Sequence, residues 1–70
     1  MADAVAEMVG KVWKIEVAMG QKVEADDIVV ILESMKMEIP VMAPEGGTVK
    51  EIKCAVGQTV QEGDVLVVIG

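Results

Sequence analysis

The sequence contains no histidine, arginine, phenylalanine or tyrosine, and it has only one tryptophan and one cysteine. The lack of histidine excludes imidazole acid–base catalysis, histidine-containing triads and histidine zinc sites. The lack of arginine removes the guanidinium fork that binds phosphate in two places. The one thiol, Cys54, allows neither an internal disulfide nor a cysteine metal cage, and it suits a reducing compartment. Few routes to enzymatic chemistry therefore remain.

Positive charge is also scarce, because six lysines face twelve carboxylates and the formal net charge is −6. The lysines are scattered and form no basic stripe that would bind nucleic acid or anionic lipid. Asp3 and Glu7 lie in the first nine residues, which hold no basic residue, so we expect no signal peptide. The longest apolar runs, 28–32 and 65–69, are too short to cross a bilayer. We expect a cytoplasmic protein that binds neither nucleic acid nor membrane.

The chain does contain an internal repeat. A shift of 37 positions aligns residues 10–33 with residues 47–70, and nine of these 24 pairs are identical. The segment between them, 34–46, has no counterpart in this alignment. We therefore expect one domain, 1–70, built from two half-repeats at about 10–33 and 47–70.

Each half-repeat is predicted to form short strands, because β-branched valine and isoleucine favour a pleated sheet. Apolar residues alternate with polar or small ones at the start of each half, which predicts a half-buried strand with its apolar members packed. These members are Trp13, Ile15 and Val17 in the first half and Ile52, Cys54 and Val56 in the second. The runs 28–32 and 65–69 predict strands that are buried on both faces.

Two turns separate the predicted strands of each half. Gly20 and Gly57 are expected at positive φ, and Asp27 and Asp64 are expected to form the following turns through their side chains. Two such halves bury their apolar faces only against each other. The predicted fold is all-β: a flattened barrel or sandwich of two small antiparallel sheets with quasi-two-fold symmetry.

The residues that break this repeat are Ser-Met-Lys-Met-Glu at 34–38. They lie between the buried run 28–32 and a second predicted strand, 39–43. So short a connection predicts a hairpin with Lys36 at its tip. By the symmetry of the repeat, this tip should lie at the opposite end of the molecule from the two termini.

The sequence E-S-M-K-M-E at 33–38, followed by A-P-E-G-G-T-V at 43–49, resembles the biotinyl/lipoyl attachment domains. It is most similar to the small stand-alone biotin carrier proteins, and the resemblance extends from about Met8 to Ile69. It implies the barrel-sandwich hybrid fold and covalent biotin on Lys36. The chain departs from the family pattern in three ways: Ser34 replaces an alanine, the segment A-E-M-V-G at 6–10 lacks a proline, and no thumb segment interrupts either half.

The resemblance also implies a function without catalysis. A biotin protein ligase would modify Lys36, and the arm would then carry a carboxyl group between biotin carboxylase and carboxyltransferase components. The flanking residues implied in ligase recognition are Glu33, Ser34, Met35, Met37 and Glu38. We expect a monomer, either as a stand-alone subunit or as an excised domain.

Two alternatives use the same fold. A lipoyl carrier would hold lipoate on Lys36, although lipoyl domains usually carry D-K-A where this chain has M-K-M. An unmodified interaction module would leave Lys36 unacylated. The three forms differ in intact mass.

Overall fold

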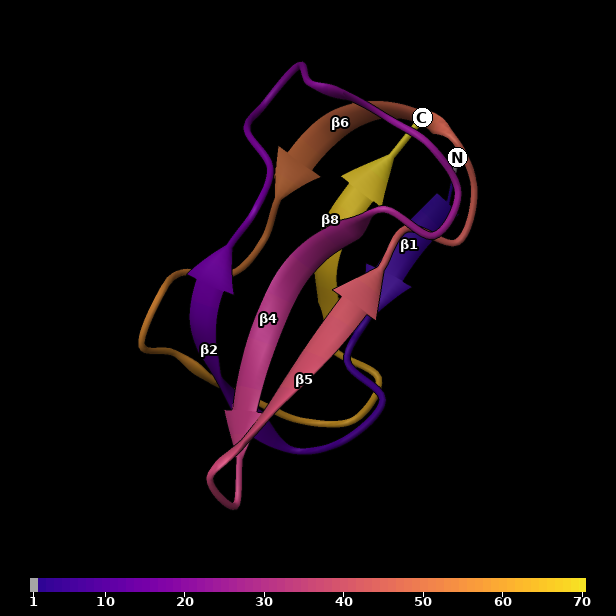
Figure 1. Cartoon of the computed structure of the whole chain (residues 1–70). Coiled ribbons are helices and arrows are strands. Elements are labelled where there is room, and N and C mark those ends of the chain that lie inside the picture. Colours follow the sequence, from indigo (N-terminus) through magenta and orange to yellow (C-terminus); the bar gives the residue numbers. More distant parts are fainter. Residues whose placement is uncertain (1) are drawn as a thin grey trace.

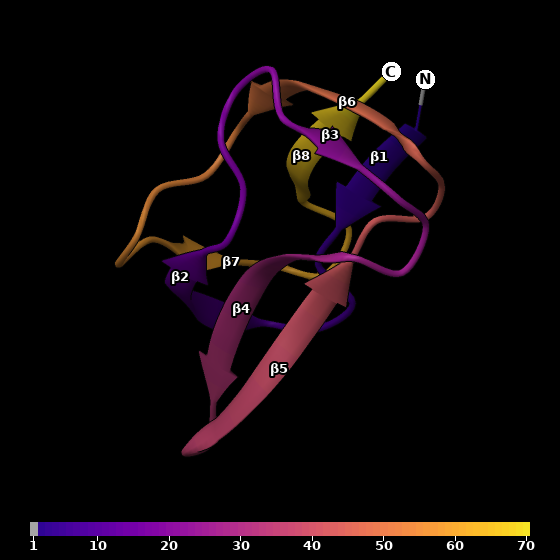
Figure 2. The ribbon, with the colours of Figure 1, turned by 45° about the horizontal axis from the view of Figure 1, so that its top comes forward.

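The computed structural model describes residues 2–70, which form eight strands in two four-stranded antiparallel sheets (Figures 1 and 2). The strands are β1 (Ala2–Val5), β2 (Gly10–Ile15), β3 (Lys22–Val23), β4 (Ile28–Ser34), β5 (Met37–Met42), β6 (Gly47–Ile52), β7 (Thr59–Val60) and β8 (Val65–Ile69). Within this range, no helix is long and apolar enough to span a bilayer. The all-β prediction with two antiparallel sheets is confirmed.

The two halves of the chain interlock. One sheet has the strand order β1-β8-β6-β3, and the other has the order β5-β4-β2-β7. Each sheet therefore combines strands of both half-repeats: β8 and β6 with β3 in one sheet, and β4 and β2 with β7 in the other. The short strands β3 and β7 make this exchange, because each pairs with a long strand of the other half, β6 and β2 respectively. Neither half can complete its sheet alone.

The pairing register shows how closely the halves correspond. Ala2 pairs with Ile69 on β1 and β8, just as Ile39 pairs with Leu32 on β5 and β4, and both members differ by 37 positions. The same shift relates the other three pairs of β1 and β8 to pairs of β5 and β4, and the pairs at the tip, Glu33 with Glu38 and Ser34 with Met37, have no counterpart. The prediction that 34–46 has no counterpart is therefore wrong, because residues 39–43 match residues 2–6. Only 34–38 lack a counterpart within the described residues.

The core consists of aliphatic side chains between the two sheets. Within residues 2–70, no polar or charged side chain is buried. The buried side chains are Ala4, Ala6, Val12, Val17, Val23, Val29, Val30, Leu32, Val41, Ala43, Val49, Val60, Leu66, Val67, Val68 and Ile69. The largest shares come from β4 and β8, as the apolar runs predict, although Ile28 at the start of β4 is 44% exposed.

Two predicted core positions are wrong. Trp13 is 47% exposed because the register of β2 shifts between Val12 and Lys14, which turns the side chain between them outward. Val56 is 65% exposed because β6 ends at Ile52, so Val56 belongs to a turn and not to the strand. The alternation of inward and outward side chains is therefore interrupted at the register shift in β2 and stops where β6 ends.

The predicted turns are confirmed. Gly20 and Gly57 have φ of 82° and 92°. Asp27 accepts a hydrogen bond from the Glu24 N–H at 2.8 Å, and Asp64 accepts the equivalent bond from the Gln61 N–H at the same distance. A second repeated pair was not predicted: the side-chain oxygens of Gln21 and Gln58 accept from Ala18 N–H and Ala55 N–H at 3.0 Å.

Candidate functional site

The site that the sequence predicts lies on the hairpin of β4 and β5. These strands pair along their length, from Ile28 with Met42 to Ser34 with Met37, and two residues, Met35 and Lys36, join them. Figure 1 shows the hairpin extending away from the rest of the molecule, with its turn at the end opposite the two termini. The predicted position of the tip is confirmed. Leu32, which is fully buried, anchors the base of the hairpin in the core.

The turn itself has an unusual backbone. Met35 has φ of 53° and Lys36 has φ of 65°, so both residues are in the left-handed region. Positive φ at both central residues is the hallmark of a type I′ turn, whose twist matches that of the flanking strands. Such turns are usually made by Asn-Gly, because an L-residue with a Cβ is strained there. Met and Lys at these positions therefore lower the stability of the turn relative to Asn-Gly.

The side chains at the tip face solvent. Met35 is 90% exposed and Met37 is 65% exposed. Glu33, Lys36 and Glu38 are also exposed, and Ser34 is half-buried. All six predicted site residues therefore lie together at this end of the hairpin. Apolar side chains that are this exposed contribute little to the core.

The charges at the tip are arranged around the lysine. Glu33 and Glu38 lie directly opposite each other on β4 and β5, an arrangement of like charges that weakens strand pairing. Within residues 2–70, the two ion pairs are Lys14 with Glu16 and Lys53 with Glu51, on other parts of the surface. No ion pair or hydrogen bond of the described structure holds the Lys36 ammonium. A primary amine in this setting fits covalent attachment of a carboxylic acid, because acylation disrupts no contact of the fold.

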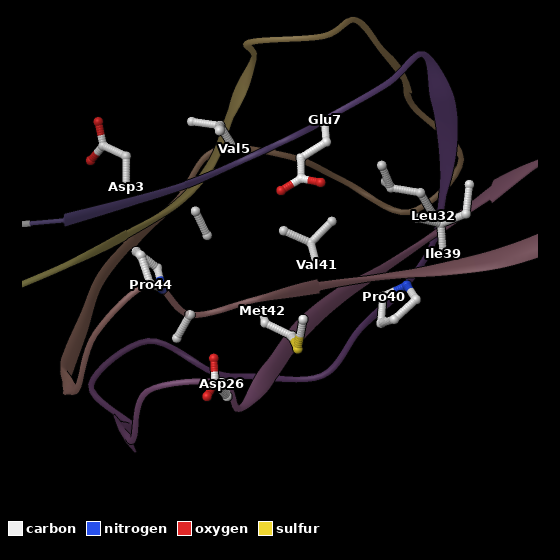
Figure 3. Close-up of a pocket in the computed structure, with 12 residues that line it drawn as sticks. Asp3, Val5, Glu7, Asp26, Leu32, Ile39, Pro40, Val41, Met42 and Pro44 are labelled. Atoms are coloured by element: carbon white, nitrogen blue, oxygen red, sulfur yellow. The ribbon is translucent and has the colours of Figure 1, made fainter.

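A second feature, a groove of about 280 Å³, lies between the edge strands β1 and β5 (Figure 3). Leu32, Val41 and Met42 are among the apolar residues that line it, and Asp3, Glu7 and Asp26 add carboxylates. The groove was not predicted, because it lies between strands of different halves and has no local sequence signal. It contains no lysine, so Lys36 lies outside it.

Cys54 packs against the core from a half-buried position. Burial raises the pKa of its thiol above the ordinary value, because desolvation disfavours the thiolate. The thiol is thus held in its less reactive form. Across residues 2–70, no group of three or more acidic, cysteine or histidine side chains is placed to hold a metal ion.

Comparison with known proteins identifies the family. The family described as "Biotin-requiring enzyme" matches residues 1–69. The "Biotin/lipoyl attachment protein" of Bacillus subtilis is 51% identical over 45 residues, which are 64% of this chain and 62% of that protein. The "Biotinylated protein TB7.3 homolog" of Mycobacterium leprae is 45% identical over 49 residues, which are 70% of this chain and 69% of that protein. The first of these matches thus spans less than two thirds of its relative.

Solved structures show the same fold within larger proteins. The urea carboxylase of Kluyveromyces lactis superposes with a TM-score of 0.92 and 40% identity, over 97% of this chain and 6% of that one. A single-chain, multi-domain long-chain acyl-CoA carboxylase gives a TM-score of 0.85 and 29% identity, over 93% of this chain and 6% of that one. The family resemblance is confirmed: the chain belongs to the biotin/lipoyl attachment family.

Proposed function

We propose that Lys36 is the residue of this carrier domain to which biotin is attached, and that a biotin protein ligase attaches it. The observation that carries the proposal is the position of this lysine, alone in the two-residue turn of an exposed hairpin. The other lysines lie in or directly after strands of the body, at Lys11, Lys14, Lys22, Lys50 and Lys53. None of them lies in a segment without a counterpart in the repeat.

The residues around Lys36 offer a ligase two kinds of contact, apolar and charged. Met35 and Met37 present apolar surface on either side of the amine, which a ligase can cover and thereby remove from water. Glu33 and Glu38 present two carboxylates at the base of the turn, which suit cationic side chains on the ligase. Ser34 pairs with Met37 at the last rung before the turn, and its small side chain leaves room for the two strands to pair there. The deprotonated Nζ atom attacks the carbonyl carbon of a biotinyl-adenylate that the ligase presents. An amide bond forms, the C–O bond to the phosphate breaks, AMP leaves, and the amine gives up a further proton to solvent.

Biotin, when bound, supplies a group that accepts a carboxyl group at one active site and releases it at another. The contribution of this chain is to hold that arm at one end of a rigid body 31 Å long. Tethering turns each transfer into a local encounter and raises the effective concentration of the arm at both sites. We propose a non-catalytic, monomeric, cytoplasmic carrier that serves a biotin carboxylase and a carboxyltransferase component.

The named relatives support this assignment. They include the urea carboxylase structure and the "Biotin-dependent acyl-coenzyme A carboxylase alpha3 subunit" of Mycobacterium leprae, which is 54% identical over 67% of this chain. Lipoate on the same lysine is the second candidate, because the Bacillus subtilis relative is named for both groups. The methionine on each side of Lys36 favours biotin, since the lipoyl domains that this chain resembles carry D-K-A there.

Intact mass after expression with a biotin protein ligase tests the proposal. We expect one biotin on the wild-type chain and on the control variant Lys50→Arg, which changes an exposed lysine on β6. The variant Lys36→Arg should fold, because its side chain is exposed, but should take no biotin, because a guanidinium is not acylated under these conditions. Streptavidin capture of Lys36→Arg would contradict the proposal. A lipoyl mass on the wild-type chain would favour the second candidate.

A further inference from the structure

The described methionines share one property, which is that none of them is buried. Their exposed fractions are 41% for Met8, 61% for Met19, 90% for Met35, 65% for Met37 and 50% for Met42. Methionine usually fills gaps in protein cores, but every methionine among residues 2–70 is exposed. The most exposed two lie on either side of Lys36. The tip of the hairpin therefore presents two exposed thioether groups, one on each side of Lys36 in the sequence.

The other sulfur in the described chain is less available. Cys54 is half-buried, and the pKa of its thiol is raised by desolvation, so little of the reactive thiolate is present near neutral pH. A thioether needs no deprotonation to be oxidised, and its susceptibility depends on exposure. Met35 is consequently the more exposed of the two sulfur side chains to an oxidant in solution.

We propose that Met35 and Met37 form a reversible oxidation site that controls attachment at Lys36. A peroxide is the oxidant. The sulfur attacks one peroxide oxygen, the O–O bond breaks, an S–O bond forms, and the other oxygen leaves as water. Sulfur gives up two electrons and the peroxide takes them. Methionine sulfoxide reductases reverse the change with electrons from thiols.

The structure explains why this change alters recognition without unfolding the domain. Oxidation of a buried methionine disrupts a core, but the two tip side chains bury little, so the fold loses no packing. Oxidation makes the surface on both sides of the amine polar, where the proposed function needs it apolar. A ligase that covers these side chains then loses apolar contact on both sides of its target. The inference therefore rests on the proposed function, and its ligase step requires that function.

The experiment treats the unmodified protein with graded hydrogen peroxide, maps each oxidised residue by mass spectrometry and measures the initial rate of biotinylation. We expect Met35 to oxidise first, Met37 and Met19 at similar rates after it, and Cys54 later. The rate should fall about tenfold, as the loss of part of one apolar contact predicts. Treatment with the reductases should restore it. Circular dichroism should not change.

Two variants separate the tip from the rest of the surface. In Met35→Leu with Met37→Leu, the rate before and after peroxide should be the same, because leucine is apolar and is not oxidised. In the matched control Met19→Leu, peroxide should slow biotinylation as in the wild type. Early oxidation of Cys54, or an unchanged rate with both tip methionines oxidised, would overturn the inference. If the untreated protein takes no biotin, the proposed function fails and the ligase step fails with it, while the map still decides whether the tip oxidises first.

Discussion

Replacing Met35 with glycine should make the domain more stable, although Met35 contacts almost nothing. The left-handed conformation of Met35, with φ of 53°, costs an L-residue about 1–2 kcal/mol. Glycine adopts it without strain but loses about 0.5–1 kcal/mol more through the freedom of the unfolded chain. At the midpoints of these two ranges, the difference leaves a gain of about 0.75 kcal/mol. In a domain of this size, that gain raises the melting temperature by about 3–6 °C.

The matched control is Met19→Gly. Met19 is also exposed, at 61%, but it is not among the residues with positive φ, so the same substitution should lower stability by about 0.5–1 kcal/mol. Thermal unfolding of both variants, followed by circular dichroism, gives the sign of each effect. Met35→Gly should also be biotinylated more slowly, because one apolar flank of Lys36 is gone. A melting temperature lowered as much as in Met19→Gly would show that the turn is not strained.

Three other substitutions test the scaffold and the register of the tip. Gly20→Ala and Gly57→Ala should each destabilise the domain by about 1 kcal/mol in urea unfolding, because both φ values are positive and an added Cβ meets nothing within 4 Å; unequal effects would contradict the equivalence of the halves. Gly47→Ala should destabilise by about 1–3 kcal/mol, because the new Cβ would lie 2.9 Å from a buried isoleucine methyl. The double variant Met35→Lys with Lys36→Met should keep its circular dichroism spectrum but incorporate biotin roughly 100-fold more slowly, because the amine is displaced; a rate close to that of the wild type would show that the ligase reads only accessibility.

The strands and turns were predictable where a pattern within a few consecutive residues determines them. Apolar runs and paired turn glycines indicate β4, β8 and the turns at Gly20 and Gly57, and the structure agrees. Trp13 could not be placed, because a register shift in β2 turns it outward and depends on the partner strand β4. The exchange of β3 and β7 between sheets was equally hidden, since two-residue strands carry no periodicity. The features that could not be predicted, the orientation of Trp13 and the pairing of β3 and β7, depend on which strand lies next to them in the sheet.

The candidate site was predictable for a different reason. The repeat predicts a scaffold, and residues 34–38 stand out because the repeat does not explain them. The backbone of the turn was not predictable, since Met and Lys rarely adopt positive φ and sequence preference points to Asn or Gly. The departure from the preference for Asn or Gly at positive φ marks Met35 and Lys36 as positions where exposed side chains are kept although they lower stability. Local disagreement with the fold is expected at functional positions.

The pseudo-two-fold symmetry also explains why the site and the termini lie at opposite ends. The strand β4 continues through a tight turn into β5, whereas the equivalent strands β8 and β1 pair in the corresponding register but lie at the two ends of the described residues. Because the symmetry exchanges these two strand pairs, the hairpin turn and the chain ends are equivalent places in the fold (Figure 2). A carrier joined through its termini to another protein would consequently present Lys36 away from the junction. The tip would then stay open to the ligase and the active sites that the proposed function requires, with no rearrangement of the domain.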